Sequence, residues 1–93
     1  MEQFLEIYEP INEFNFELKI TINNTKKKNF MWLSNMDHEI TISDIKFLIS
    51  IFWEIQYYNQ ILKYGECILD EDEKTLGNYN ISTTSEIFLE ILN

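Results

Sequence analysis

The sequence predicts an α+β domain in which a mixed sheet folds over one main helix. Three observations carry this prediction: alternating residues at 14–22, a capped apolar helix that begins after Thr41, and further alternation at 86–92. Alternation with a period of two indicates a strand with one buried face, whereas apolar residues at helical spacing indicate a helix packed on one side. A sheet wrapped around one helix accounts for the order strand, strand, helix, strand, strand.

The first two strands are expected to form a hairpin. The first alternating stretch runs into the sequence Asn-Asn-Thr, where asparagine tolerates the positive φ angles of a turn. A second strand is predicted at residues 29–33. Its register stays open, because Phe30 and Trp32 compete with Met31 and Leu33 for the buried side.

The helix is predicted from its cap and from its apolar spacing. The Thr41 hydroxyl can accept a hydrogen bond from the amide of Asp44, and the carboxylate of Asp44 completes a capping box. Ile45 and Ile49 fall at helical spacing and define the buried face. The helix is expected to end near residue 53, although no glycine or proline marks that end.

A third strand and an acidic loop complete the predicted fold. Residues 60–64 alternate, and Gly65 permits the turn that follows them. The acidic run at 70–73 lacks the ligand spacing and the glycine of a calcium loop, so we interpret it as a solvated loop. The predicted core consists of Leu18, Ile20, Ile45, Ile49, Leu62, Leu69, Leu76, Ile87 and Leu89.

Two segments resemble ubiquitin. Residues 41–60, TISDIKFLISIFWEIQYYNQ, resemble its helix and following loop without a gap, and residues 75–81, TLGNYNI, resemble the TLSDYNI of that family. With the last strand, the resemblance covers most of residues 16–93. It implies the β-grasp fold, in which Tyr79 would hydrogen-bond the backbone of the preceding loop. The chain therefore divides into an N-terminal extension, 1–13, and a ubiquitin-like domain, 14–93.

The departures from ubiquitin bear on function. Ubiquitin conjugates through a C-terminal diglycine, whereas this sequence ends at Asn93, so we expect a protein that is not conjugated. The alternative is a modifier whose Gly-Gly tail is absent from this chain. The resemblance also places Lys63 and Glu90 where ubiquitin has an isoleucine and a valine of its apolar recognition patch. Ordinary ubiquitin receptors should therefore bind this chain poorly.

The predicted function is a protein-interaction module that uses one or both of two surfaces. The outer side of the sheet keeps apolar residues around Lys63 and Glu90, and the helix carries large apolar residues where ubiquitin has small or polar ones. The predicted partner-binding residues are Ile61, Lys63, Phe88, Glu90 and Leu92 on the sheet, and Phe47, Ile51 and Phe52 on the helix.

The N-terminal extension is too apolar for a disordered tail. Phe4, Leu5, Ile7, Tyr8 and Ile11 need a surface to cover. A helix that is apolar nearly all round is normally buried on more than one side. We therefore expect the extension to pack on a second face of the helix, with Leu48 and Trp53 part of that face, or two chains to pair there. The protein is accordingly predicted to be a monomer or a weak homodimer.

Charge and cysteine usage exclude several classes of function. The formal net charge of −9 is unsuited to nucleic acid, which requires a basic face, and favours a basic patch on a protein partner. The longest apolar run, residues 47–53, is far too short to span a bilayer, so no membrane partner is expected. Cys67 is the lone cysteine and no secretory signal precedes it, which predicts a reducing compartment, the cytoplasm or the nucleus. The abundance of Ile, Asn and Lys, without Ala, Val or Arg, suggests an AT-rich genome.

No catalytic, cofactor or metal site is predicted. His38 is the only histidine, and with Asp37 and Ser34 nearby nothing in the sequence orients it for hydrolysis. Cys67 lies between acidic residues, whose negative charge disfavours a reactive thiolate. One cysteine and one histidine are too few for a zinc site.

Overall fold

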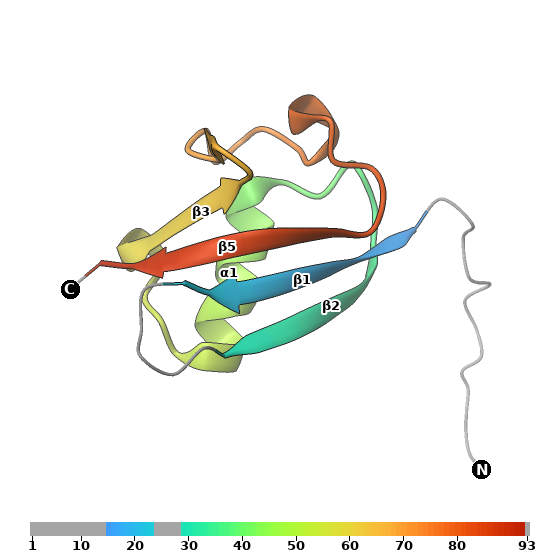
Figure 1. Ribbon diagram of the computed structural model, residues 1–93. Coiled ribbons are helices and arrows are strands. Elements are labelled where there is room, and N and C mark those ends of the chain that lie inside the picture. The colour runs from blue at the N-terminus through green and yellow to red at the C-terminus, as the bar shows by residue number, and fades with distance from the viewer. Residues whose placement is uncertain (1–14, 24–28, 93) are drawn as a thin grey trace, which may run out of the picture.

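The predicted class, a mixed sheet folded over one helix, is confirmed by the computed structural model, which describes residues 15–23 and 29–92 (Figure 1). The sheet has the strand order β2-β1-β5-β3-β4. The strands are β1 (Phe16–Ile22), β2 (Phe30–Met36), β3 (Gln60–Tyr64), β4 (Cys67–Ile68) and β5 (Ser85–Ile91), and the helix is α1 (Ile42–Trp53). β1 and β5 are parallel, and the other pairs are antiparallel. The predicted extension, residues 1–13, and the hairpin loop, residues 24–28, lie outside the described residues.

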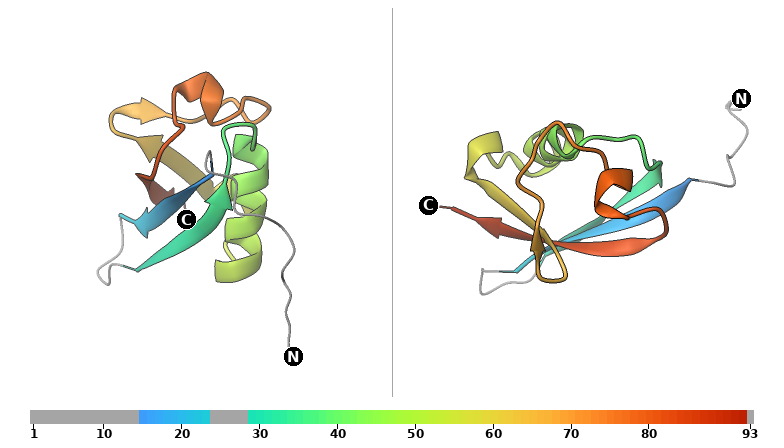
Figure 2. Two further views of the ribbon diagram at one scale, coloured as in Figure 1. Left: turned by 90° about the vertical axis from the view of Figure 1, so that its right-hand side faces the viewer. Right: turned by 90° about the horizontal axis from the view of Figure 1, so that it is seen from above.

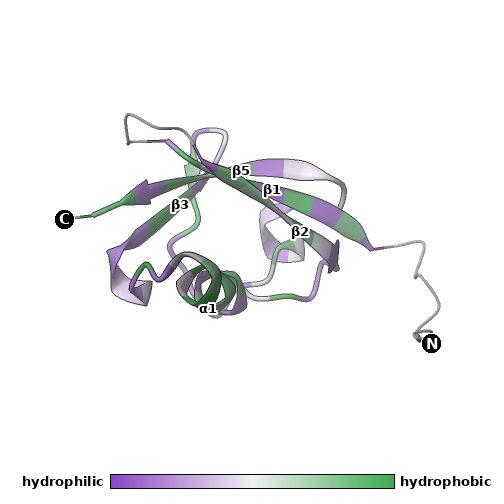
Figure 3. Cartoon of the chain, turned by 90° about the horizontal axis from the view of Figure 1, so that it is seen from below, coloured by the Kyte–Doolittle hydropathy of each residue, from purple (hydrophilic) through white to green (hydrophobic). Residues whose placement is uncertain are grey.

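The core lies between the concave side of the sheet and one side of α1 (Figures 2 and 3). All nine residues predicted for the core are buried. Phe16, Ile22, Leu33, Met36, Ile42 and Ile81 join them. Alternation places the apolar strand residues on one side of the sheet, while helical spacing aligns Ile42, Ile45 and Ile49 opposite them. The other side of the sheet and the far side of α1 are therefore the two faces left for solvent.

A bulge in β2 decides the register that the sequence left open. Leu33 and Met36 are buried, whereas Phe30 and Trp32 are exposed. The pairing with β1 shifts by one residue between Leu33 and Met36, and Asn35 adopts a φ of 63° there. The predicted strand, 29–33, is therefore too short. A bulge turns two apolar residues three positions apart to the same side, which simple alternation does not reveal.

The predicted cap of α1 is confirmed. The Asp44 amide donates to Thr41 Oγ1 at 3.1 Å, and the Thr41 amide donates to the Asp44 carboxylate. The amides of Ile42 and Ser43 donate to the carbonyls of Lys74 and Asp72, each at 2.9 Å. Four donors at the helix start are thus satisfied, two of them by the loop that follows β4. The helix ends as predicted at residue 53, where Glu54 takes the left-handed conformation. No helix in the described part of the chain is long and apolar enough to cross a bilayer.

Candidate functional site

The outer side of the sheet, away from α1, presents a row of side chains that crosses every strand. Thr21 pairs with Phe30 on one side and with Phe88 on the other, and Lys63 pairs with both Phe88 and Ile68. Residues directly opposite each other in neighbouring strands point to the same face. Beside this row lie Lys19, Trp32, Ile61, Glu86 and Glu90, and together these residues form the outer sheet face.

Each lysine of the outer sheet face lies beside a glutamate of the same face. Lys63 Nζ is 3.7 Å from Glu90 Oε1, and Lys19 Nζ is 4.0 Å from Glu86 Oε2. Thr21 Oγ1 donates to the same Glu86 oxygen at 2.7 Å. Because these pairs form across neighbouring strands, most of the charge on this face is balanced internally.

Two aromatic residues of the outer sheet face were not predicted to bind a partner. The Lys19 ammonium lies 4.5 Å from the ring centre of Phe30 and 6.0 Å from that of Trp32. Ile68, on the unpredicted strand β4, is a third apolar residue that the sequence did not assign to the face. One signal for the aromatic pair was available: once Leu33 is assigned to the core, alternation places Trp32 outside.

The predicted sheet residues do lie together. Ile61, Lys63, Phe88 and Glu90 are partly buried members of the outer sheet face, as alternation predicted. Leu92 follows β5 and is 45% exposed, with its amide donating to the Asn59 carbonyl at 2.8 Å. Their grouping therefore agrees with the sequence, while the binding of a partner by these residues stays a prediction.

α1 carries a second apolar surface, the helix patch, formed by Phe47 and Ile51 on its far side and by Phe52 in its last turn. Their exposed fractions are 60%, 54% and 61%, so more than half of each residue is open among the described residues. Leu48 and Trp53 were expected on the same face, but they are only partly exposed and pack against the core. These two residues therefore border the helix patch without sharing the exposure of its members.

A buried lysine connects α1 to the acidic loop. Lys46 is 9% exposed, and its Nζ lies 3.0 Å from Asp72 Oδ1. The Tyr57 hydroxyl donates to Asp72 Oδ2 at 2.7 Å. This hydrogen bond is the main reason that the pKa of Asp72 lies below its ordinary value; partial burial opposes the shift and Lys46 reinforces it. The interpretation of the acidic run as a solvated loop is therefore wrong for Asp72, because this residue anchors the loop to the helix.

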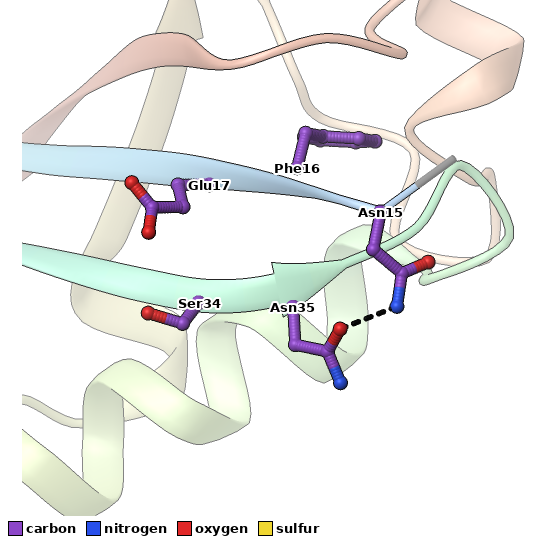
Figure 4. A pocket seen from close by; sticks show the side chains of 5 residues that line it. All are labelled: Asn15, Phe16, Glu17, Ser34 and Asn35. Carbon is purple, nitrogen blue, oxygen red and sulfur yellow. Dashed lines mark hydrogen bonds between the residues drawn. The ribbon is translucent and has the colours of Figure 1, made fainter. Parts of the chain in front are cut away.

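The hollow between β1 and β2 is open and offers little chemistry. It measures about 290 Å³ and is lined by Asn15, Phe16, Glu17, Ser34 and Asn35. Figure 4 shows the Asn15 and Asn35 side chains turned toward each other and joined by a hydrogen bond. With one carboxylate and two amides, the hollow has no base held beside a nucleophile.

The residues considered for hydrolysis are engaged in local structure. The Asp37 carboxylate accepts a hydrogen bond from the Glu39 amide at 2.7 Å, and the His38 carbonyl accepts one from the Gly77 amide at 2.8 Å. His38 itself is exposed. Within residues 15–23 and 29–92, no group of three or more His, Cys, Asp or Glu side chains is placed to hold a metal ion.

Solved structures identify the architecture. A ubiquitin from Caldiarchaeum subterraneum has a TM-score of 0.74 at 14% identity, over 85% of this chain and 95% of that one. The ubiquitin-like domain of an Arabidopsis thaliana protein has a TM-score of 0.66 at 20% identity, over 99% of this chain and 90% of that one. No protein-family model and no curated protein matches the sequence. The chain thus has the ubiquitin-like β-grasp fold, and the Glu71 amide donates to the Tyr79 hydroxyl oxygen at 3.2 Å, as the resemblance implied.

Proposed function

We propose that this chain is a protein-interaction module that binds a protein partner non-covalently through its outer sheet face. The observation that supports this most strongly is the row across the sheet, whose ends, Phe30 and Ile68, are each about half exposed. Single apolar residues are common on protein surfaces, but large apolar residues grouped on one face, as Phe30, Trp32 and Phe88 are here, are typical of a binding face. The proposed role requires no catalysis.

The charges of the outer sheet face suit a partner that places neutral hydrogen-bonding groups, rather than apolar anchors, over Lys63 and Glu90. Lys63 and Glu90 neutralise each other, so a partner can cover both without supplying a counter-charge. An interface of this kind has an apolar centre, here Phe88 and Ile61, and polar groups that fix its orientation. Trp32 adds the residue type that most often dominates binding energy.

The pair Lys63–Glu90 is also proposed to exclude ubiquitin receptors. A ubiquitin-associated domain should bind the full chain more weakly than it binds ubiquitin, because its apolar anchors would meet charged groups. The variant Lys63→Ile with Glu90→Val should gain affinity by about tenfold or more, since it removes both charges together. Equal binding of chain and ubiquitin on this face, measured by titration calorimetry, would contradict the proposed specificity.

A partner-based experiment tests the proposed function itself. The immobilised full chain would be used to capture proteins from native extract, and a captured partner would then be purified and titrated. The double variant Phe30→Ser and Ile68→Ser should weaken binding by about tenfold or more, because both side chains contact the partner. Phe47→Ser, on the far side of α1 and similarly exposed, is the matched control. Unchanged affinity of the folded double variant would refute the proposal.

The alternative function, a conjugated modifier, requires a suitable C-terminal tail. An activating enzyme acts on a Gly-Gly at the end of an extended tail, which residues 92–93 of this chain, Leu-Asn, do not supply. We therefore expect incubation of this chain with activating enzyme and ATP to yield no covalent adduct. A thioester at the C-terminus, detected by mass spectrometry, would favour the modifier.

A further inference from the structure

We infer that the helix patch is a second binding site, whose ligand is a basic amphipathic segment of another protein. Such a segment has an apolar side that covers Phe47, Ile51 and Phe52, and lysines or arginines beside it. Because α1 lies behind the sheet, this site is on the opposite side of the domain from the outer sheet face (Figure 2). The inference is therefore independent of the proposed function.

The helix patch is formed by three large side chains that are each more than half exposed. Phe47 and Ile51 are one turn apart and lie side by side, and Phe52 extends the apolar surface toward Leu48, one turn before it. Leu48 is partly buried and packs on the core, so the exposed side chains rest on a fixed base. Three exposed large side chains at this spacing match the way a helical surface receives an apolar stripe.

The charges around the helix patch have one sign. Asp44 lies one turn before Phe47, and Glu54 follows the last turn, so an exposed carboxylate stands at each end of the patch. The lysine of α1, Lys46, lies on the buried side and is paired with Asp72. The patch thus combines apolar contact area with negative charge that no lysine among the described residues pairs.

No lysine in the described part of the chain is left to neutralise these carboxylates. Residues 15–23 and 29–92 contain four lysines, and each lies within 4.0 Å of a carboxylate other than Asp44 or Glu54. Lys26, Lys27 and Lys28 lie outside the described residues. Lysines or arginines on a partner would therefore find an exposed carboxylate that no described lysine pairs at each end of the patch, which favours a basic ligand. Asp44 keeps its capping hydrogen bond from the Thr41 amide in such a complex.

The same charges disfavour the two occupants available from the protein itself. The extension 1–13 carries Glu2, Glu6, Glu9 and Glu13 and no lysine or arginine. A second copy packed on the patch would bring its own Asp44 and Glu54 toward those of the first. Like charges placed together at an interface oppose binding, so a basic segment from another protein is the complementary choice.

The test uses the full chain, labelled with ¹⁵N, and a synthetic helical peptide of about 18 residues with a leucine stripe flanked by lysines. A peptide with glutamate in place of each lysine is the control. We expect the lysine peptide to shift the amide signals of residues 47–52 and to bind more weakly as salt is added. The glutamate peptide should not bind.

Two matched variants locate the site. The double variant Phe47→Lys and Ile51→Lys should lower the affinity for the lysine peptide by about tenfold or more. It removes apolar contact area and adds positive charges that repel the peptide. Phe30→Lys with Trp32→Lys, which alters equally exposed residues on the sheet, should leave the affinity unchanged. Glu54→Gln should weaken binding less and reduce its dependence on salt.

Each contrary result overturns the inference. Equal binding of both peptides, or shifts confined to the strands, would exclude a basic ligand at the helix patch. If residues 47–52 do not shift and the helix variant lowers the melting temperature, the extension covers the patch. If sedimentation shows a dimer that Ile51→Lys dissociates, a second copy is the occupant. The function proposed for the sheet would survive all of these results, because its test alters Phe30 and Ile68.

Discussion

The outer sheet face and the helix patch are both apolar, but they differ in how charge is arranged. On the sheet, Lys63 and Lys19 each lie within 4.0 Å of a glutamate in the neighbouring strand. Around the helix patch, Asp44 and Glu54 have no such cation among the described residues. A face with internally paired charges can be covered by a neutral surface, whereas unpaired carboxylates gain from a cationic one. The two proposed sites therefore call for partners of different charge.

The largest predicted effect contrasts the two sides of α1. Ile49 is fully buried and Ile51 is 54% exposed, although they are two residues apart on the same helix. Ile49→Ala should lower the free energy of unfolding by about 2–5 kcal/mol, because it opens a cavity beneath the sheet. Ile51→Ala should change it by less than about 0.5 kcal/mol. Urea unfolding of both variants measures the difference. Similar losses in both would mean that the helix patch is covered in the free protein.

An intermediate effect concerns Asp72, the carboxylate of the acidic run that is bound to Lys46 of α1 and to Tyr57. Tyr57→Phe removes the hydroxyl that donates to Asp72 and should cost about 1 kcal/mol at neutral pH. Tyr58→Phe, at a residue 74% exposed, is the matched control and should cost nothing measurable.

The same hydrogen bond predicts a pH dependence. The folded-state pKa of Asp72 lies below the ordinary value of 3.8, so the ionised carboxylate stabilises the folded state. This contribution is complete above the unfolded-state value and is lost as the pH falls through the folded-state value. The melting temperature of the wild type should therefore fall more steeply below about pH 4 than the melting temperature of Tyr57→Phe. Parallel curves would contradict the role given to this hydroxyl.

The smallest effect concerns the paired charges of the outer sheet face. Lys63 and Glu90 are both more than a third exposed, so a double-mutant cycle with Lys63→Ala and Glu90→Ala should give a coupling of about 0.2–1 kcal/mol. Added salt should reduce it. The pair is therefore expected to contribute little to stability, and a coupling well above this range would contradict that expectation.

Local patterns predicted the frame of the fold, because its causes are local. Alternation in the strands and the Thr41 cap correctly placed the core and the start of α1. The strand β4 was missed, since two residues show no period, and the bulge of β2 concealed its register. The anchoring of Asp72 depends on Lys46 and Tyr57, far from it in sequence, so no local pattern could show it.

The candidate surfaces were predicted in part for the same reason. Alternation placed Ile61 and Phe88 on the outer sheet face, and helical spacing placed Phe47 on the far side of α1. The contrast in charge was not predictable, because it depends on which strands are neighbours. Lys19 and Glu86 meet only because β1 pairs with β5.

The most direct test of this contrast measures proton relaxation of the full chain with small soluble paramagnetic probes, one cationic and one anionic. Near Phe47, Ile51 and Phe52, the cationic probe should enhance relaxation clearly more than the anionic probe, because negative potential concentrates cations. Near Phe88 and Trp32 the two probes should act almost equally, since the charges there are paired. Equal action at both faces would contradict the account, as would protection of the helix patch from both probes.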